Sequence, residues 1–190
     1  MTLRILGIAG SLRAASFNRA LLHAAIEVAP EGVAIDIFDG LGAIPPYNAD
    51  VEAQGDPAAV VALKTAIGDA DALLIATPEY NYGVPGVLKN AIDWASRPPG
   101  KCVLNGKPAA LMGATPGGTG TARAQLALRQ SFVFTDTCAL LRPEVLIARA
   151  HEKIDAAGRV TDATTRELIR RLLDALVDWT RRVGAPRPPA

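Results

Sequence analysis

The chain has 190 residues, of which 49% are hydrophobic and 21% charged, and this ordinary globular composition excludes wholesale disorder and a fibrous repeat. At roughly 150 residues per domain, the length predicts one domain over residues 1–184, with a short tail at 185–190. The 20 basic and 19 acidic side chains leave a formal charge of +1, so no overall field favours nucleic acid or an acidic membrane surface. Any anion site must therefore be local.

Cysteine and histidine usage narrows the chemistry further. The two cysteines, Cys102 and Cys138, form no CxxC pair, which excludes a disulfide framework and a four-cysteine metal cage and predicts a cytoplasmic protein. The sequence has no HExxH or GxSxG motif, and His23 lies far from His151, so we expect neither a metal site nor an acyl-transfer triad. No apolar stretch is long enough for a membrane span. A redox role for Cys102, which follows a turn of proline and glycine, stays open.

Strands and helices are expected to alternate along the chain. A short apolar run predicts a buried strand, and apolar residues at helical spacing predict a helix. In chain order this gives a strand at residues 3–9, a helix at 16–28, a strand at 33–38, a helix at 57–68, a strand at 72–77, a helix at 85–96, a strand at 109–114, a helix at 121–134, a strand at 145–148 and a helix at 161–182.

The order of these segments predicts the fold class. A long loop at residues 39–56 precedes the second helix, which Asp56 is expected to cap because its carboxylate can accept backbone N–H bonds. Apolar strands that alternate with helices predict a parallel sheet with helices on both faces. We therefore expect an α/β fold whose five parallel strands follow the order 2-1-3-4-5, with ligands binding at their carboxyl ends.

The loop after the first expected strand, GSLRAASFN at residues 10–18, offers several donors to an anion. Ser11 and Ser16 supply hydroxyls, Arg13 a guanidinium and Asn18 an amide, and the following helix begins with unpaired N–H groups. A phosphate monoester suits this set. A plainer interpretation fits the segment equally well: Ser16 only caps the helix, and Arg13 is solvated. The loop is neither GxGxxG nor GxxxxGK[ST], which disfavours nucleoside triphosphate chemistry.

Turn-forming residues also follow the third and fourth expected strands. Residues 78–86 hold Tyr80 and Tyr82, two of the three tyrosines, and a turn beside aromatic rings suits a planar polar ligand. Residues 115–118 form a second turn, whose small side chains let a ligand approach the backbone closely. Because the carboxyl ends of parallel strands meet at one edge of the sheet, the three loops together predict a flat cofactor with a phosphate group.

Three segments resemble the NADPH-dependent FMN reductase family, especially its chromate and quinone reductase branch: residues 10–18, PEYNYGVPGVLKNAIDW at 78–94 and ATPGGTGTARAQ at 114–125. The similarity covers nearly the whole chain in order, and it implies a flavodoxin-like fold that binds FMN. The resemblance also implies a set of binding residues. They are Ser11, Arg13, Ser16, Phe17 and Asn18 at the FMN phosphate, Pro78, Glu79, Tyr80, Asn81 and Tyr82 along the ring system, and Thr115 and Gly117 near its far edge.

A bound flavin supplies the redox chemistry itself, so no catalytic side chain is expected. The resemblance implies an oxidoreductase that passes hydride from NADPH or NADH through FMN to quinones or similar acceptors, namely flavins, azo compounds and chromate, by a ping-pong mechanism. The alternative is a non-catalytic electron carrier of the flavodoxin type. Such carriers usually have an acidic surface, whereas this chain has a charge of +1 and Arg13 in its phosphate loop. These features favour the enzyme.

The resemblance further implies a homodimer, with contacts from Tyr47 in the 39–56 loop and from the helix at 85–96. In the chromate reductase branch, an ARxQY motif and a later Glu join two dimers into a tetramer. Arg123 and Glu144 match this pattern, but Leu126 replaces the tyrosine, so the network that would join two dimers lacks one member. The other expected partner is a small-molecule electron acceptor; neither nucleic acid nor a membrane is expected.

Overall fold

A computed structural model describes residues 2–183, so the expected tail at 185–190 lies outside the described residues. The strands are β1 (Leu3–Ala9), β2 (Val33–Ile37), β3 (Ala72–Ala76), β4 (Pro108–Ala114), β5 (Cys138–Ala139) and β6 (Val145–Ile147). The α-helices are α1 (Phe17–Glu27), α2 (Ala49–Glu52), α3 (Ala58–Asp69), α4 (Gly86–Ala95), α5 (Ala122–Thr135) and α6 (Ala163–Val183), and the 3-10 helices are η1 (Gly40–Ala43) and η2 (Ala150–Glu152). The ten expected strands and helices are all present, with ends that shift by one or two residues.

The sheet is parallel throughout, and its strands follow the order β2-β1-β3-β4-β5, as predicted. The fifth position, expected at residues 145–148 alone, is divided between two short strands. Pro108 and Ala109 pair with β5, whereas the other end of β4, from Met112 to Ala114, pairs with β6. The chain leaves the sheet between them, at a segment with Pro143, which has no N–H group to donate to a neighbouring strand.

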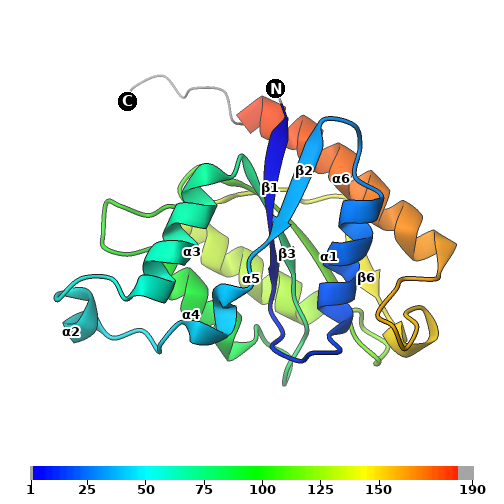
Figure 1. The fold of residues 1–190 in the computed structure, drawn as a ribbon, viewed down its shortest axis with the longest axis horizontal. Coiled ribbons are helices and arrows are strands. Elements are labelled where there is room, and N and C mark those ends of the chain that lie inside the picture. Colours follow the sequence, from blue (N-terminus) through cyan, green and yellow to red (C-terminus); the bar gives the residue numbers. More distant parts are fainter. Residues whose placement is uncertain (1, 184–190) are drawn as a thin grey trace.

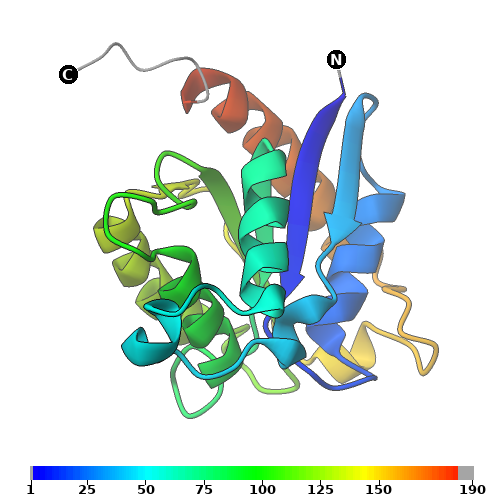
Figure 2. The same ribbon diagram turned by 60° about the vertical axis from the view of Figure 1, so that its left-hand side comes forward.

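Helices cover both faces of the sheet, which confirms the predicted layers. One core lies between the sheet and helices α1 and α6, and the other between the sheet and helices α3, α4 and α5. Side chains alternate along β1, so Ile5 enters the first core and Leu6 the second. Figure 1 shows the sheet between these layers, and the turned view in Figure 2 brings α3 in front of it.

The segment between β2 and α3 differs from the expected plain loop. It contains η1 and α2, and hydrogen bonds fix it to α4: the side chain of Asn90 accepts from the Tyr47 N–H group at 2.7 Å, and the Trp94 indole donates to the Pro45 carbonyl at 2.8 Å. The expected cap of α3 is wrong. Pro57 occupies the cap position without a side-chain bond, because the Asp56 carboxylate turns to Lys64 Nζ at 2.5 Å instead.

The last helix, α6, is long and two-sided. Ile169, Leu172, Leu173 and Leu176 on one side are buried against the sheet, while Arg170 on the other is exposed. The charged outer side gives the helix the amphipathic pattern of a surface helix. None of the helices within residues 2–183 is both long and apolar enough to cross a membrane.

Candidate flavin site

Three loops come together at the carboxyl ends of β1, β3 and β4, along the lower edge of the molecule in Figure 1. Gly10, directly after β1, donates its N–H group to the Ala76 carbonyl at 2.9 Å. A Cβ on Gly10 would lie 3.0 Å from Leu88 and 3.1 Å from Pro78, so this close approach of the first two loops favours glycine. Pro78 is thereby buried beneath the first loop, and its expected contact with the flavin ring stays a prediction.

The first loop, between β1 and α1, carries the expected phosphate residues. Ser16 Oγ accepts from the Arg19 N–H group at 3.2 Å, which confirms its role as the N-cap of α1. The cap leaves the N–H groups of Phe17 and Asn18, in the first turn, without a partner inside the helix. Ser11 Oγ accepts from the Arg13 N–H group and from the Tyr80 hydroxyl, both at 3.4 Å. The first loop is therefore tied to the second while its helix start stays open to an anion.

The guanidinium of Arg13, in the first loop, forms no ion pair or hydrogen bond within residues 2–183. The side chain is exposed, and its guanidinium carbon lies 5.9 Å from the centroid of the Phe17 ring. Both residues line a groove of about 650 Å³, which His151 and residues 154–158 close on the other side. The plainer interpretation, a solvated Arg13, describes this structure, and the same freedom leaves the guanidinium available for a phosphate.

Asn18 has a different place from the one its expected role suggests. Its side chain is only 3% exposed, and its amide makes two hydrogen bonds with Ala114 at the end of β4. The amide Nδ2 donates to the Ala114 carbonyl at 3.0 Å, and Oδ1 accepts from the Ala114 N–H group at 2.9 Å. The amide thus joins the first loop to the third; a phosphate contact by Asn18 remains a prediction.

The second loop, after β3, contains a strained four-residue turn. Tyr80 and Gly83 exchange two backbone hydrogen bonds, of 3.2 and 2.9 Å, and the central residues Asn81 and Tyr82 have φ angles of +49° and +65°. Positive φ is rare for a bulky residue such as tyrosine, and such strain costs about 1–3 kcal/mol per residue. Strain of this size is typical of functional loops that the surrounding structure holds in place.

Glu79 connects this second loop to α5. Its carboxylate accepts from the N–H groups of Arg123 and Ala124, at 2.9 and 3.2 Å, and from the Arg123 guanidinium at 2.9 Å. Glu79 therefore caps α5 from outside the helix, since the N-cap residue Thr121 makes no side-chain cap bond. Burial raises the pKa of Glu79, whose side chain is 7% exposed, but the hydrogen bonds from Arg123 and Ala124 outweigh burial and bring that pKa below its ordinary value.

Arg123 lies at the candidate site, where the sequence had suggested only a contact between dimers. Its guanidinium carbon lies 3.8 Å from the centroid of the Tyr82 ring, and Tyr82 itself is 71% exposed. Sequence spacing cannot predict this contact, because Tyr82 lies on the second loop and Arg123 in the first turn of α5. Leu126, which replaces the tyrosine of the network between dimers, is exposed, and Glu144 pairs with Arg142 at 2.9 Å.

The third loop, after β4, is held by the segment that follows β6. Thr115 Oγ1 accepts from the Gly117 N–H group at 3.2 Å, which shapes the turn. The Gly117 carbonyl accepts from the Arg149 N–H group, and the Thr115 carbonyl from that of Ala150, each at 3.0 Å. The structure therefore brings Thr115 and Gly117 to the same end of the sheet as the other two loops.

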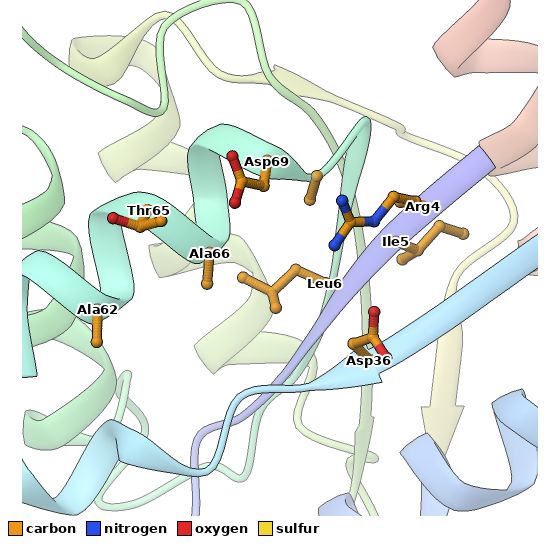
Figure 3. A pocket seen from close by; sticks show the side chains of 9 residues that line it. Arg4, Ile5, Leu6, Asp36, Ala62, Thr65, Ala66 and Asp69 are labelled. Atoms are coloured by element: carbon orange, nitrogen blue, oxygen red, sulfur yellow. The ribbon is translucent and has the colours of Figure 1, made fainter. Parts of the chain in front are cut away.

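A separate cavity of about 400 Å³ lies away from these loops, between α3 and the start of β1 (Figure 3). Arg4 and Asp36 extend from neighbouring strands, and Thr65 and Asp69 line the opposite wall on α3. The cavity contains none of the expected site residues. Cys102, also remote, is half-buried, with its thiol 3.8 Å from the Thr135 carbonyl. No cluster of three or more potential metal ligands occurs in the described part of the chain.

A doubly wound parallel sheet with three converging loops at its carboxyl edge defines an α/β protein of the flavodoxin-like class. The profile of the family described as NADPH-dependent FMN reductase matches residues 3–152, which is most of the chain. The chain therefore belongs to the NADPH-dependent FMN reductase family, as the sequence motifs predicted.

Named relatives agree with this assignment. An NAD(P)H-dependent FMN reductase of Pseudomonas aeruginosa is 53% identical over 95% of this chain and 97% of its own length. A 2-hydroxy-1,4-benzoquinone reductase of Burkholderia sp. is 42% identical over 95% of this chain and 98% of its own. The solved structure of FerB, a flavoenzyme NAD(P)H:(acceptor) oxidoreductase from Paracoccus denitrificans, is 38% identical, covers 96% of this chain and 99% of its own, and superposes with a TM-score of 0.87.

Proposed function

We propose that this chain is an FMN-dependent NAD(P)H oxidoreductase that reduces quinones. The observation that carries the proposal is the meeting of three loops at the carboxyl ends of β1, β3 and β4, in a chain of the FMN reductase family. The relatives named as FMN and quinone reductases match over nearly their full length, which favours an enzyme over an electron carrier of the flavodoxin type.

The residues at these loops fit FMN. Its phosphate needs N–H donors and a positive charge, and the start of α1 offers open N–H groups beside Ser11, Ser16 and the uncommitted guanidinium of Arg13. Its ring system is flat and carries polar edges, for which the strained second loop presents backbone groups next to tyrosine rings. The third loop, at Thr115 and Gly117, supplies small side chains and further backbone groups.

In this proposal the protein binds and orients while the cofactor reacts. When bound, FMN supplies the hydride chemistry, taking two electrons from NAD(P)H and delivering them to the acceptor. Glu79, Tyr80, Asn81 and Tyr82 would hold the ring system, and the cap residue Ser16 would keep the start of α1 available to the phosphate. Because both substrates use the same open side of the site in turn, we expect ping-pong kinetics.

The partners are small molecules and a second copy of the chain. Quinones suit a two-electron donor, and we propose that flavins, azo compounds and chromate are incidental acceptors. A homodimer is proposed, with the anchored segment around Tyr47 and α4 at its interface. Arg123 and Glu144 already have partners in their own chain, so an Arg–Tyr–Glu network between dimers is not part of the proposal.

Absorbance spectroscopy tests the function directly. The purified protein, or the apo-protein mixed with FMN, is expected to show a bound flavin spectrum that bleaches as soon as NADPH or NADH is added. Adding a benzoquinone should restore the oxidised spectrum, and double-reciprocal plots should give parallel lines. A protein that never takes up FMN refutes the proposal, and a bound flavin that stays oxidised without a partner enzyme indicates a carrier. Light scattering after gel filtration gives the number of chains per particle.

A further inference from the structure

Arg123 contacts the second loop twice, through two different kinds of interaction. One nitrogen of its guanidinium donates to Glu79 Oε1 at 2.9 Å, and the guanidinium carbon lies 3.8 Å from the centre of the Tyr82 ring. Glu79 in turn accepts from the N–H groups of Arg123 and Ala124 in the first turn of α5, so it cannot move without uncapping the helix. The second loop is therefore connected to α5 at two positions, through Glu79 before the 80–83 turn and through Tyr82 within it.

The turn at residues 80–83, which contains Tyr82, needs such support. Asn81 and Tyr82 both have positive φ, and neither is glycine, so the isolated segment would favour another conformation. Tyr82 is 71% exposed, and its hydroxyl makes no hydrogen bond within residues 2–183. Beside the backbone bonds between Tyr80 and Gly83, the guanidinium stacked on the Tyr82 ring is thus a side-chain contact that favours the observed backbone.

We propose that Arg123 is a positioning residue for the flavin: by stacking on Tyr82 while bound to Glu79, it holds the strained 80–83 turn in the shape that receives the ring system. The inference rests on the proposed function, since it concerns FMN. It assigns to Arg123 a role within its own chain, in place of the contact between dimers suggested by the sequence. Arg123 itself takes no part in electron transfer.

The test compares Arg123→Met with Arg166→Met. Arg166 is a matched control, because it too is a partly exposed helix arginine bound to a carboxylate, Glu27 at 2.6 Å, and it contacts none of the three loops. FMN is titrated into each apo-protein, and the dissociation constant is read from quenching of flavin fluorescence. The midpoint potential of the bound flavin is measured in parallel, because an altered turn changes the surroundings of the ring, whereas a general loss of stability does not.

We expect R123M to bind FMN at least tenfold more weakly than wild type and to shift the potential, with R166M unchanged in both. Wild-type affinity and potential in R123M overturn the proposal. If R123M does not fold, Arg123→Lys takes its place: lysine keeps the charge beside Glu79 but cannot stack as a planar fork. R123K should also bind FMN more weakly than wild type, and a wild-type dissociation constant in this variant likewise overturns the proposal.

A double-mutant cycle with Tyr82→Leu separates the stacking contact from other effects. If the two side chains act through one contact, the loss of FMN affinity in R123M/Y82L is smaller than the product of the two single losses. If the loss of FMN affinity in the double variant equals the product of the two single losses, the two side chains act independently and the role assigned to their contact is wrong. Failure of the proposed function gives a different result: wild type itself binds no FMN. If wild type and R123M bind FMN equally tightly, the proposed reductase function still stands and only the role of Arg123 is refuted.

Discussion

Asn18 and Ala114, 96 positions apart in the sequence, are joined by a pair of hydrogen bonds that closes the carboxyl edge of the sheet. The Asn18 amide donates one hydrogen bond and accepts another, so it pairs with both the C=O and the N–H group of Ala114, the last residue of β4. An aspartate lacks the donor and a leucine lacks both groups, which makes asparagine the suitable residue here. The first turn of α1 and the third loop are thereby held in a fixed relation.

Asn18→Ala should lower the free energy of unfolding by about 1–3 kcal/mol, because it leaves the buried N–H and C=O groups of Ala114 without partners. Urea unfolding followed by circular dichroism measures this loss. Asn105→Ala is the control, since the Asn105 side chain is exposed and makes no hydrogen bond within residues 2–183. If both variants unfold at the wild-type urea concentration, the amide does not hold the two loops together.

Arg13→Ala should weaken FMN binding by about 1–3 kcal/mol, the size of one hydrogen bond between charged groups. Because the guanidinium contacts no acceptor within the described chain, the apo-protein should keep its unfolding midpoint. Isothermal titration with FMN, and with riboflavin, which lacks the phosphate, locates the effect: the loss should appear for FMN alone. Arg171→Ala, an exposed arginine on α6, is the control for the change in net charge. Unchanged FMN affinity in R13A would show that Arg13 does not bind the phosphate.

The strand and helix order was predictable from the sequence because local patterns determine it. Continuous apolar runs such as β1, and helical spacing such as that of α6, carry their own signal. The division of the fifth strand was not predictable, since it depends on where the chain can pair with β4. Asp56 was misread for a similar reason: a good capping residue pairs with a lysine eight positions away.

The candidate site shows the same contrast. Its loops were found because turn residues follow apolar strands, a signal contained within each segment. The contacts between loops had no such signal: Glu79 caps a helix 43 residues further on, and Asn18 binds the end of β4. The family resemblance placed Arg123 between dimers, because a motif shows which residue is present and not which way its side chain turns. Contacts of this kind arise only when the sheet brings distant segments together.

Gly113, on β4, illustrates how closely the third loop packs. A Cβ at this position would lie 1.9 Å from Thr121 Oγ1 and 2.5 Å from the Thr77 carbonyl oxygen. The backbone of Thr77 cannot easily move aside, because its N–H group donates to the Met112 carbonyl at 2.9 Å. Gly113→Ala should therefore cost about 3 kcal/mol of stability. Gly68→Ala in α3, where nothing lies within 4 Å, should instead stabilise by about 0.5–1 kcal/mol through helix propensity. Thermal unfolding measures both effects: the unfolding temperature should fall in Gly113→Ala and rise in Gly68→Ala. A shift of both temperatures in the same direction contradicts this account.

Glu79 should make the stability of the protein depend on pH in acid. In the folded protein its pKa lies below the ordinary value of 4.5. Burial raises this pKa, but the hydrogen bonds from Arg123 and Ala124 lower it by more than burial raises it. A carboxyl group whose pKa is lowered by folding stabilises the protein above its unfolded value, and this contribution is lost as the pH falls through the folded value. The ionised Glu79 should thus contribute fully at pH 6–7 and progressively less below about pH 4.5.

Glu79→Gln isolates this effect, because the amide keeps the shape of the side chain and one acceptor oxygen but carries no charge. Wild type should be more stable than E79Q at pH 7, and the difference should shrink between pH 4.5 and pH 3 as the wild-type carboxylate becomes protonated. Asp155 and Asp162, whose pKa values are also lowered, titrate alike in both proteins, so their contribution cancels in the comparison. Urea unfolding from pH 3 to pH 7 gives the two curves, and a constant gap between them means that the charge of Glu79 does not stabilise the start of α5.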